Sequence, residues 1–263
     1  MNFFRPACLC LTGLLGLSLS LTSAADSLAS EVEAIYDAKL KDLFLHFHRN
    51  PELSTMEHQT SARLATELES LGYAVHTGVG GTGIVALLEN GEGPLVMFRA
   101  DMDGLPVEEK SGLSYASRAK QVDPNGNEVF VMHACGHDGH TAMLLGAAKY
   151  LAETRNFDGT VVVIFQPAEE GGGGGREMCE DGMMDRWNIQ EVYGMHNWPG
   201  RPVGSFAIRP GAFFAATDQF DITFEGRGGH AAKPQETIDT TVMAAQAVTA
   251  LQTPILYSLC TRH

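Results

Sequence analysis

Four stretches of the chain place histidine, cysteine or acidic side chains directly after a short apolar run. In chain order these side chains are Asp101 and Asp103, then His133, Cys135, His137 and Asp138, then Glu169 and Glu170, and finally His196. Ligands of an open α/β sheet bind at the carboxyl ends of its strands, where consecutive strand endings meet. We therefore predict that these side chains converge on one site.

The residue types in this set are those that bind transition metals. Cys135 and His137 stand two apart across a glycine, so both side chains can reach one centre. Imidazole and thiolate suit zinc, manganese, cobalt or nickel, whereas calcium and magnesium prefer oxygen ligands. A carboxylate can bridge two such metals, as two-metal hydrolases require. The pattern predicts a hydrolytic site with two divalent transition metals.

The adjacent acids Glu169 and Glu170 point in different directions if they lie on a turn. One carboxylate can then bind metal while the other collects a proton from the attacking water. Coordination lowers the pKa of water to about 7, so a nearby carboxylate can take that proton and deliver it to a leaving amine. A solvated acidic pair is the alternative, and the preceding apolar run argues against it.

The elements that must position these residues alternate along the chain. Helical spacing of apolar residues predicts helices over 31–48, Met56–Leu71 and Thr141–Leu151. Apolar runs predict strands at Ile84–Leu88, Leu95–Phe98, Val129–Met132, Val161–Phe165 and Val192–Met195. Strands interleaved with helices indicate an α/β fold, a layered catalytic domain with a mostly parallel sheet.

The pattern changes near Arg209. A new strand is predicted at Phe220–Phe224, a turn at Gly226–His230 and a helix at Thr237–Leu251. We interpret this region as the start of a small α+β domain. The predicted domains are a metal-binding catalytic domain over 26–208 and a partial dimerisation or lid domain over 209–263.

The N-terminal segment, the net charge and the cysteine spacing limit what class of protein this can be. Residues 1–25 combine Arg5, a short apolar core and small residues, which is typical of a signal peptide and predicts an exported, periplasmic or secreted protein. A net charge of −14 argues against nucleic acid or an anionic membrane as a partner. Cysteine spacing gives no disulfide framework.

Some motifs are interpreted as structural. Gly78–Gly83 matches G-x-G-x-x-G, but a strand rather than a helix follows, so we expect a hairpin turn and not a phosphate site. His46, His48, His58 and His76 lie outside the four stretches and are expected to be surface or packing residues. A nucleophilic role for Cys135 is disfavoured because metal would occupy its thiolate.

Five motifs resemble one family. They look like the amidohydrolase branch of the carboxypeptidase G and aminoacylase superfamily, which includes hippurate hydrolases, N-acyl-amino-acid hydrolases and auxin-conjugate hydrolases. The resemblance runs from about residue 31 to about residue 253, with the motifs in the family's order. The motifs are Arg99–Pro106, Met132–Asp138, Phe165–Gly171, Met195–His196 and Gly226–Pro234.

The resemblance implies a zinc-exopeptidase-like fold and a role for each matched residue. Cys135, His137, Glu170 and His196 would be the metal ligands, and Glu169 would be the general base and acid. Asp103 would orient the site. His230 would come from the dimerisation domain and stabilise the tetrahedral oxyanion. The implied reaction is hydrolysis of an N-acyl amino acid to a carboxylic acid and an amino acid, in a homodimer.

The chain differs from the family pattern in one respect. Family members carry one further metal-binding histidine near their C-terminus, which the present chain lacks, so we expect a C-terminally truncated product with an incomplete second metal site. Two alternatives stay open. One is a dipeptidase or carboxypeptidase of the same fold, and the other is an inactive remnant that only binds metal.

Overall fold

The computed structural model describes residues 27–214 and 220–260. The predicted signal peptide therefore lies outside the described residues. The chain divides into two compact units, Met1–Gly200 and Arg201–His263, which are described separately here. Within the described residues, no helix has the length and apolar character needed to cross a membrane.

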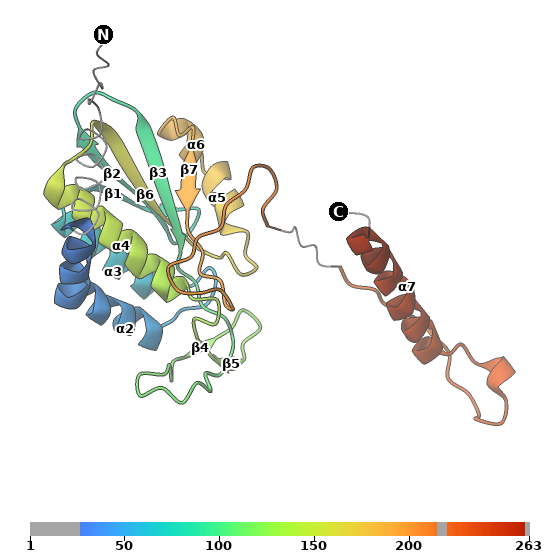
Figure 1. Cartoon of the computed structure of the whole chain (residues 1–263). Helices are drawn as coiled ribbons and strands as arrows, with labels where there is room; N and C mark the ends of the chain where they lie inside the picture. The colour runs from blue at the N-terminus through green and yellow to red at the C-terminus, as the bar shows by residue number, and fades with distance from the viewer. Residues whose placement is uncertain (1–26, 215–219, 261–263) are drawn as a thin grey trace, which may run out of the picture. The chain divides into compact units, whose positions relative to one another are not determined.

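A mixed sheet forms the centre of the first unit (Figure 1). Its strand order is β1-β2-β6-β3-β7. β2 is antiparallel to both of its neighbours, whereas β6, β3 and β7 are parallel. All strands except β2 therefore run in one direction, and the predicted α/β fold with a mostly parallel sheet is confirmed. The strands are β1 (Ala74–Val79), β2 (Gly83–Asn90), β3 (Leu95–Asp101), β6 (Gly159–Gln166) and β7 (Val192–Gly194).

The apolar run of β6 explains its central place. Alternate side chains of a strand point to opposite faces. Val161, Val163 and Phe165 pack into one hydrophobic cluster, while Val162 and Ile164 pack into another. A strand that is buried on both faces has no polar face to expose, which is why its sequence is an unbroken apolar run.

Helices cover both faces of the sheet. α2 (Lys41–Arg49), α3 (His58–Ser70) and α4 (His137–Thr154) contribute to the larger cluster through residues such as Phe47, Leu64 and Leu145. Figure 1 shows these helices together on one side of the sheet. Tyr36–Leu40 forms a π-helical stretch before α2. α5 (Gly174–Glu180) and α6 (Met183–Arg186) cover the other face through Met178 and Met183.

The prediction that Val129–Met132 is a strand of the central sheet is wrong. Glu128–Phe130 is β5, which pairs with β4 (Lys120–Val122) in a separate two-stranded sheet. A tight turn, closed by backbone hydrogen bonds of Asp123 with Gly126 and Asn127, pairs β5 with β4, its neighbour in the sequence, and not with a strand of the central sheet. The predicted turn at Gly78–Gly83 is confirmed, because β1 and β2 pair antiparallel across it and Gly80 and Gly81 have positive φ.

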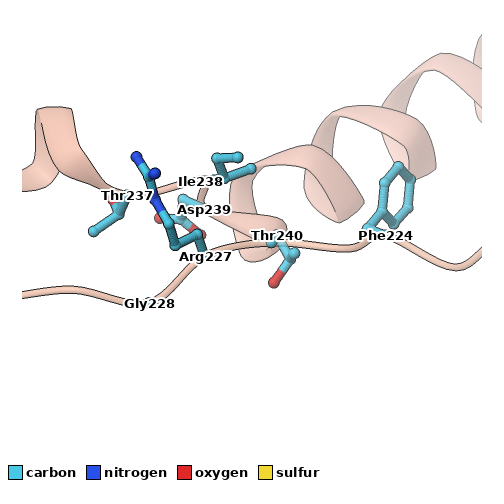
Figure 2. Close-up of a pocket in the computed structure, with 8 residues that line it drawn as sticks. Phe224, Arg227, Gly228, Thr237, Ile238, Asp239 and Thr240 are labelled. Carbon is cyan, nitrogen blue, oxygen red and sulfur yellow. The ribbon is translucent and has the colours of Figure 1, made fainter.

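The second unit contains a helix and a short hairpin-like contact. The helices are α7 (Thr240–Cys260) and the short 3-10 helix η2 (Pro234–Glu236). The backbones of Arg227 and Ile238 pair in an isolated antiparallel β-bridge. The predicted strand Phe220–Phe224 does not form, because within the described residues it has no strand to pair with. A hollow of about 450 Å³ in this unit is lined by Phe224, Gly226–Gly228 and Thr237–Thr240. Figure 2 shows the residues that line it.

Candidate metal centre

The carboxyl ends of three parallel strands meet at one edge of the sheet. The sequence predicts four such strand ends, and the fourth, after Val129–Met132, does not belong to this sheet. β3 ends at Asp101, β6 ends three residues before Glu169, and β7 ends two residues before His196. The first residue of α4 is His137, and Gly136 before it has φ +88°. This left-handed conformation favours glycine, and it separates the directions of Cys135 and His137 so that α4 can start at the sheet edge.

We call the first group of side chains the cysteine cluster: Cys135, His137, Glu170 and His196. One potential ligand atom from each of Cys135, His137 and Glu170 lies within 4.8 Å of the other two. The Cys135 Sγ lies 3.4 Å from the Nε2 atom of His196. The Nε2 atom of His137 lies 3.7 Å from the Oε1 atom of Glu170. Four of the sequence-predicted residues therefore lie together.

Asp103 contacts two members of the cysteine cluster, His137 and Glu170. Its Oδ1 atom lies 3.1 Å from the Nδ1 atom of His137, so the other ring nitrogen of His137 points to the cluster. Its Oδ2 atom accepts hydrogen bonds from the Glu170 backbone N–H at 3.0 Å and the Ser54 hydroxyl at 2.6 Å. Burial raises the pKa of Asp103, but these bonds outweigh burial and hold the pKa below its usual value.

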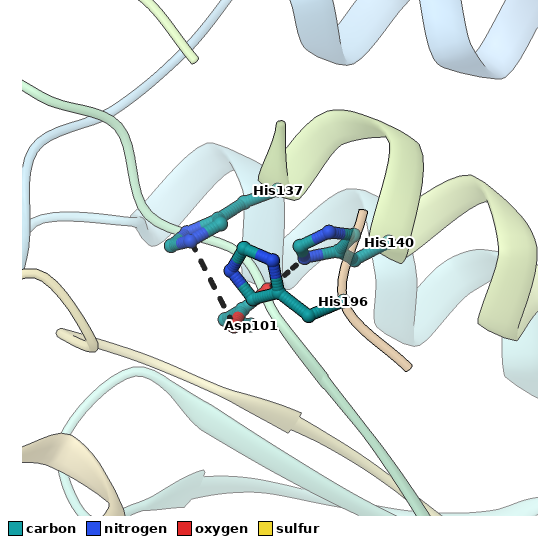
Figure 3. A group of neighbouring side chains, drawn as sticks. All are labelled: Asp101, His137, His140 and His196. Atoms are coloured by element: carbon teal, nitrogen blue, oxygen red, sulfur yellow. Dashed lines mark hydrogen bonds and ion pairs between the residues drawn. The ribbon is translucent and has the colours of Figure 1, made fainter. Parts of the chain in front are cut away.

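A second group, the aspartate cluster, lies beside the first: Asp101, Arg99, His140 and Asn197. Figure 3 shows Asp101 between His137 and His140. The Asp101 Oδ1 atom is 2.6 Å from the His140 Nδ1 atom, and its Oδ2 atom accepts from the Arg99 guanidinium at 2.7 Å. The other ring nitrogen of His140 lies 2.5 Å from the Asn197 Oδ1 atom. Burial would raise the pKa of Asp101, yet His140 and Arg99 hold it well below its usual value.

The two clusters differ in how well their polar atoms are satisfied. In the aspartate cluster both nitrogens of His140 and both oxygens of Asp101 have partners. In the cysteine cluster the buried atoms His137 Nε2 and Glu170 Oε1 find no hydrogen-bond partner among the described residues. Buried polar atoms without partners are costly and uncommon, so each such atom calls for an explanation.

The acidic surroundings of Cys135 also indicate that this cluster is suited to a cation. Burial and the carboxylates of Glu170 and Glu169 raise the pKa of the Cys135 thiol to about 12. A thiol needs a cation nearby to become the thiolate that binds metal. The donor set of sulfur, imidazole and carboxylate suits a transition metal, and the unpartnered atoms are placed to receive one. The residues present therefore fit a divalent transition metal.

Two other predicted residues have different positions. Glu169 is exposed, and its Oε2 atom lies 3.9 Å from His137 Nε2, so its carboxylate faces the cluster from the solvent side. His230 belongs to the second unit, where it is exposed and its Nδ1 atom accepts from the Ala232 N–H at 3.1 Å.

Some residues near the site were not expected there. His48, interpreted above as a surface or packing residue, contacts Asp138 at 2.7 Å and Glu109 at 3.3 Å. His140 and Asn197 were missed. Residues three apart on a helix share a face, so the spacing of His137 and His140 is a signal that could have placed His140 at the site.

Comparison with known proteins places this geometry in a family. The sequence model of peptidase family M20/M25/M40 matches residues 97–258. Hippurate hydrolase of Campylobacter jejuni is 42% identical over 206 residues, which are 78% of this chain and 51% of that protein. N-acetyl-L-cysteine deacetylase of Bacillus subtilis is 42% identical over 210 residues, which are 79% of this chain and 48% of that protein. The chain spans about half the length of these curated relatives.

A solved structure agrees with the sequence match. A dinuclear metal-binding peptidase of the M20 family from Bacillus subtilis has a TM-score of 0.58 and is 35% identical, covering 65% of this chain and 46% of that one. The family match covers the strand ends β3, β6 and β7 and all members of both clusters. This chain belongs to peptidase family M20/M25/M40.

Proposed function

We propose that this chain carries the metal site of an amidohydrolase that cleaves N-acyl amino acids to a carboxylic acid and an amino acid. The observation that carries the proposal is that two buried atoms, His137 Nε2 and Glu170 Oε1, have no hydrogen-bond partner in the described part of the chain and lie beside a cysteine in the same cluster. The names of two relatives, a hippurate hydrolase and an N-acetyl-L-cysteine deacetylase, support an N-acyl amino acid as the substrate class.

The proposed metal ligands are Cys135, His137, Glu170 and His196, which would hold up to two divalent ions of manganese, zinc, cobalt or nickel. When bound, such ions supply Lewis acidity that activates water and polarises the substrate carbonyl. Asp103 orients His137 and the Glu170 backbone through the bonds described above. It thereby keeps two of the proposed ligands aimed at one point.

Glu169 is the proposed general base and acid. Its carboxylate is near His137 and partly open to solvent, so it can take a proton from the attacking water. The hydroxyl adds to the acyl carbon, the carbon–nitrogen bond breaks, and Glu169 returns the proton to the departing nitrogen. His230 is the proposed donor to the oxyanion that forms in between, a role that usually contributes strongly to catalysis.

The remaining proposals concern the setting of the enzyme. A signal peptide over residues 1–25 would export the protein to the periplasm or the medium. The second unit would mediate a homodimer. These proposals rest on the sequence patterns and on the family, and each is independent of the metal site.

The test is metal content and hydrolysis measured on the same preparation. The purified chain is loaded with Mn²⁺, Zn²⁺, Co²⁺ or Ni²⁺, metal per chain is measured by mass spectrometry, and glycine release from hippurate is followed. Glu169→Gln serves as the matched variant, because it should keep the metal and lose about 10²–10⁴-fold in turnover. Bound metal with hydrolysis that chelators abolish supports the proposal.

Three results would contradict it. A chain that binds no transition metal has no such site. Turnover that survives in Glu169→Gln would remove Glu169 from its proposed role. Cleavage of dipeptides in preference to hippurate would favour the peptidase alternative.

A further inference from the structure

Glu57 is a fully buried carboxylate outside both clusters. Its Oε1 atom accepts hydrogen bonds from the backbone N–H groups of Thr55 at 3.0 Å and Ala168 at 2.8 Å. Its Oε2 atom accepts from the Thr82 hydroxyl at 2.6 Å. One side chain therefore joins three chain segments that are far apart in the sequence.

Two of these partners have an unusual backbone conformation. Thr55 has φ +67° and Ala168 has φ +47°, although neither is glycine. Residues with a side chain rarely adopt positive φ, and such positions persist only where the surroundings hold them. The Glu57 carboxylate binds the N–H of both residues, so it is one of the groups that hold them.

Ala168 is the residue directly before Glu169 and Glu170. Its conformation therefore sets the direction in which the carboxylate pair leaves strand β6. The other side of the pair is held by Asp103, which accepts from the Glu170 N–H. Asp103 also accepts from Ser54, the neighbour of Thr55, so both anchors draw on the same loop.

Glu57 is not simply a cap of helix α3. It occupies the N-cap position, but its side chain makes no capping hydrogen bond. The capping role belongs to Glu52, whose oxygens accept from the Gln59 N–H at 3.1 Å and the Thr60 N–H at 2.7 Å. The Glu57 side chain instead serves the turn that follows β6.

We infer that Glu57 is a positioning residue that holds the strained turn at Ala168 and so aims Glu169 and Glu170 at the cysteine cluster. This inference rests on the proposed function for the roles of the two acids. The hydrogen-bonded geometry itself does not depend on that function.

Two substitutions separate geometry from charge. In Glu57→Gln the amide oxygen can keep both backbone N–H bonds, and the amide group can donate to the Thr82 hydroxyl. In Glu57→Met the volume is similar and all three acceptor contacts are lost. Glu52→Met is the matched control, since Glu52 is also a buried acid on the same loop and accepts two backbone N–H bonds, but these come from Gln59 and Thr60 of α3 and not from Ala168.

The first measurement needs no metal. Hydrogen exchange at the Ala168 amide should become at least tenfold faster in Glu57→Met, and it should stay near the wild-type rate in Glu57→Gln and Glu52→Met. Equal exchange in wild type and Glu57→Met would overturn the inference. So would an equally large change in the Glu52 control.

The second measurement is a Co²⁺ titration of the full chain, followed by the absorption of the cobalt–thiolate pair. Groups that orient metal ligands typically contribute 10–100-fold to metal affinity, so Glu57→Met should weaken binding by about that factor while Glu57→Gln recovers it. If wild type and Glu57→Met bind cobalt equally, the positioning role is wrong while the metal site stands. If wild type binds no cobalt, the proposed function fails and the exchange rates still decide whether Glu57 holds the turn.

Discussion

The cysteine cluster and the aspartate cluster lie side by side and are built from similar residues, yet they are satisfied to different degrees. His140 and Asp101 use their polar atoms on each other, on Asn197 and on Arg99. His137 and Glu170 each keep a buried polar atom without a hydrogen-bond partner among the described residues, although the two atoms face each other at 3.7 Å. The difference indicates that the aspartate cluster holds the sheet edge together, whereas the cysteine cluster is prepared for a ligand.

The largest expected effect is a loss of stability in the satisfied cluster. His140→Ala should lower the free energy of unfolding of the metal-free protein by about 3–5 kcal/mol, because removing one partner leaves the buried Asp101 carboxylate short of a partner. Urea unfolding measures this. His76→Ala is the control, since His76 is exposed and should cost about 0.5 kcal/mol or less. A His140 variant as stable as the His76 variant would contradict the assignment of a structural role.

The converse experiment is made in the unsatisfied cluster. Cys135→Ala should weaken Co²⁺ binding by about a hundredfold, since 10–16 kcal/mol shared among four ligands is about 3 kcal/mol for each. The metal-free stability should change by less than about 1 kcal/mol, because the thiol is a weak hydrogen-bonding group. Calorimetry and unfolding of the same samples check both values. If Cys135→Ala mainly lowers stability and keeps cobalt affinity, the comparison between the clusters is wrong.

Gly136 links the two clusters, and its substitution should act on both. Alanine there would adopt a positive φ, and its Cβ would lie 2.7 Å from the Asn197 amide nitrogen. The left-handed conformation costs about 1–2 kcal/mol for a residue with a side chain, and the clash adds to that cost. We expect Gly136→Ala to lose about 2 kcal/mol of unfolding free energy.

Gly126→Ala provides the control for that value. Gly126 has nearly the same φ, +85°, but no described atom lies within 4 Å of the position of an added Cβ. It should lose only the conformational part, about 1 kcal/mol. Equal losses at Gly126 and Gly136 would mean that the Asn197 side chain moves away from the added Cβ at little cost. The hydrogen bonds of the aspartate cluster would then contribute less to stability than their number suggests.

Much of this site could be predicted from the sequence because each proposed ligand of the first unit lies within four residues of a strand end or a helix start. An apolar run such as Val161–Phe165 identifies a buried strand, and parallel strand ends must meet at one edge. That reasoning placed Glu170 and His196 together without knowledge of the strand order. For Cys135 and His137 it relied on a core strand at Val129–Met132 that does not join the central sheet, and these residues reach the site at the start of α4 instead.

The remaining features depend on contacts that a single sequence does not reveal. The run Val129–Met132 looks like a core strand, but its partner is decided by the tight turn at Asp123, which pairs it locally. The bond between His140 and Asn197 joins residues 57 positions apart. Glu57 was missed for a similar reason, since its partner Ala168 is 111 residues away.

The smallest expected effect on the free energy of unfolding comes from Glu67, which pairs with Lys39 and Arg63 outside both clusters. It shows how much an ordinary charged group contributes to the stability of this fold. Burial raises the pKa of Glu67, but hydrogen bonds and attraction from Lys39 and Arg63 outweigh burial and lower the pKa overall. A carboxylate with a lowered folded-state pKa stabilises the fold above the unfolded pKa of about 4.3, and this stabilisation is lost as the pH falls through the folded pKa.

Glu67→Gln should therefore cost about 0.5–1 kcal/mol at pH 7, a value reduced by solvent screening because both cationic partners are well exposed. The difference from wild type should begin to shrink as the pH falls below the unfolded pKa of about 4.3, and it should be lost as the pH falls through the lower folded-state pKa. Urea unfolding at pH 7 and pH 3.5 measures both values. A cost at pH 7 as large as that of His140→Ala would mean that charge pairs in general stabilise this fold strongly, and the aspartate cluster would then lose its special status.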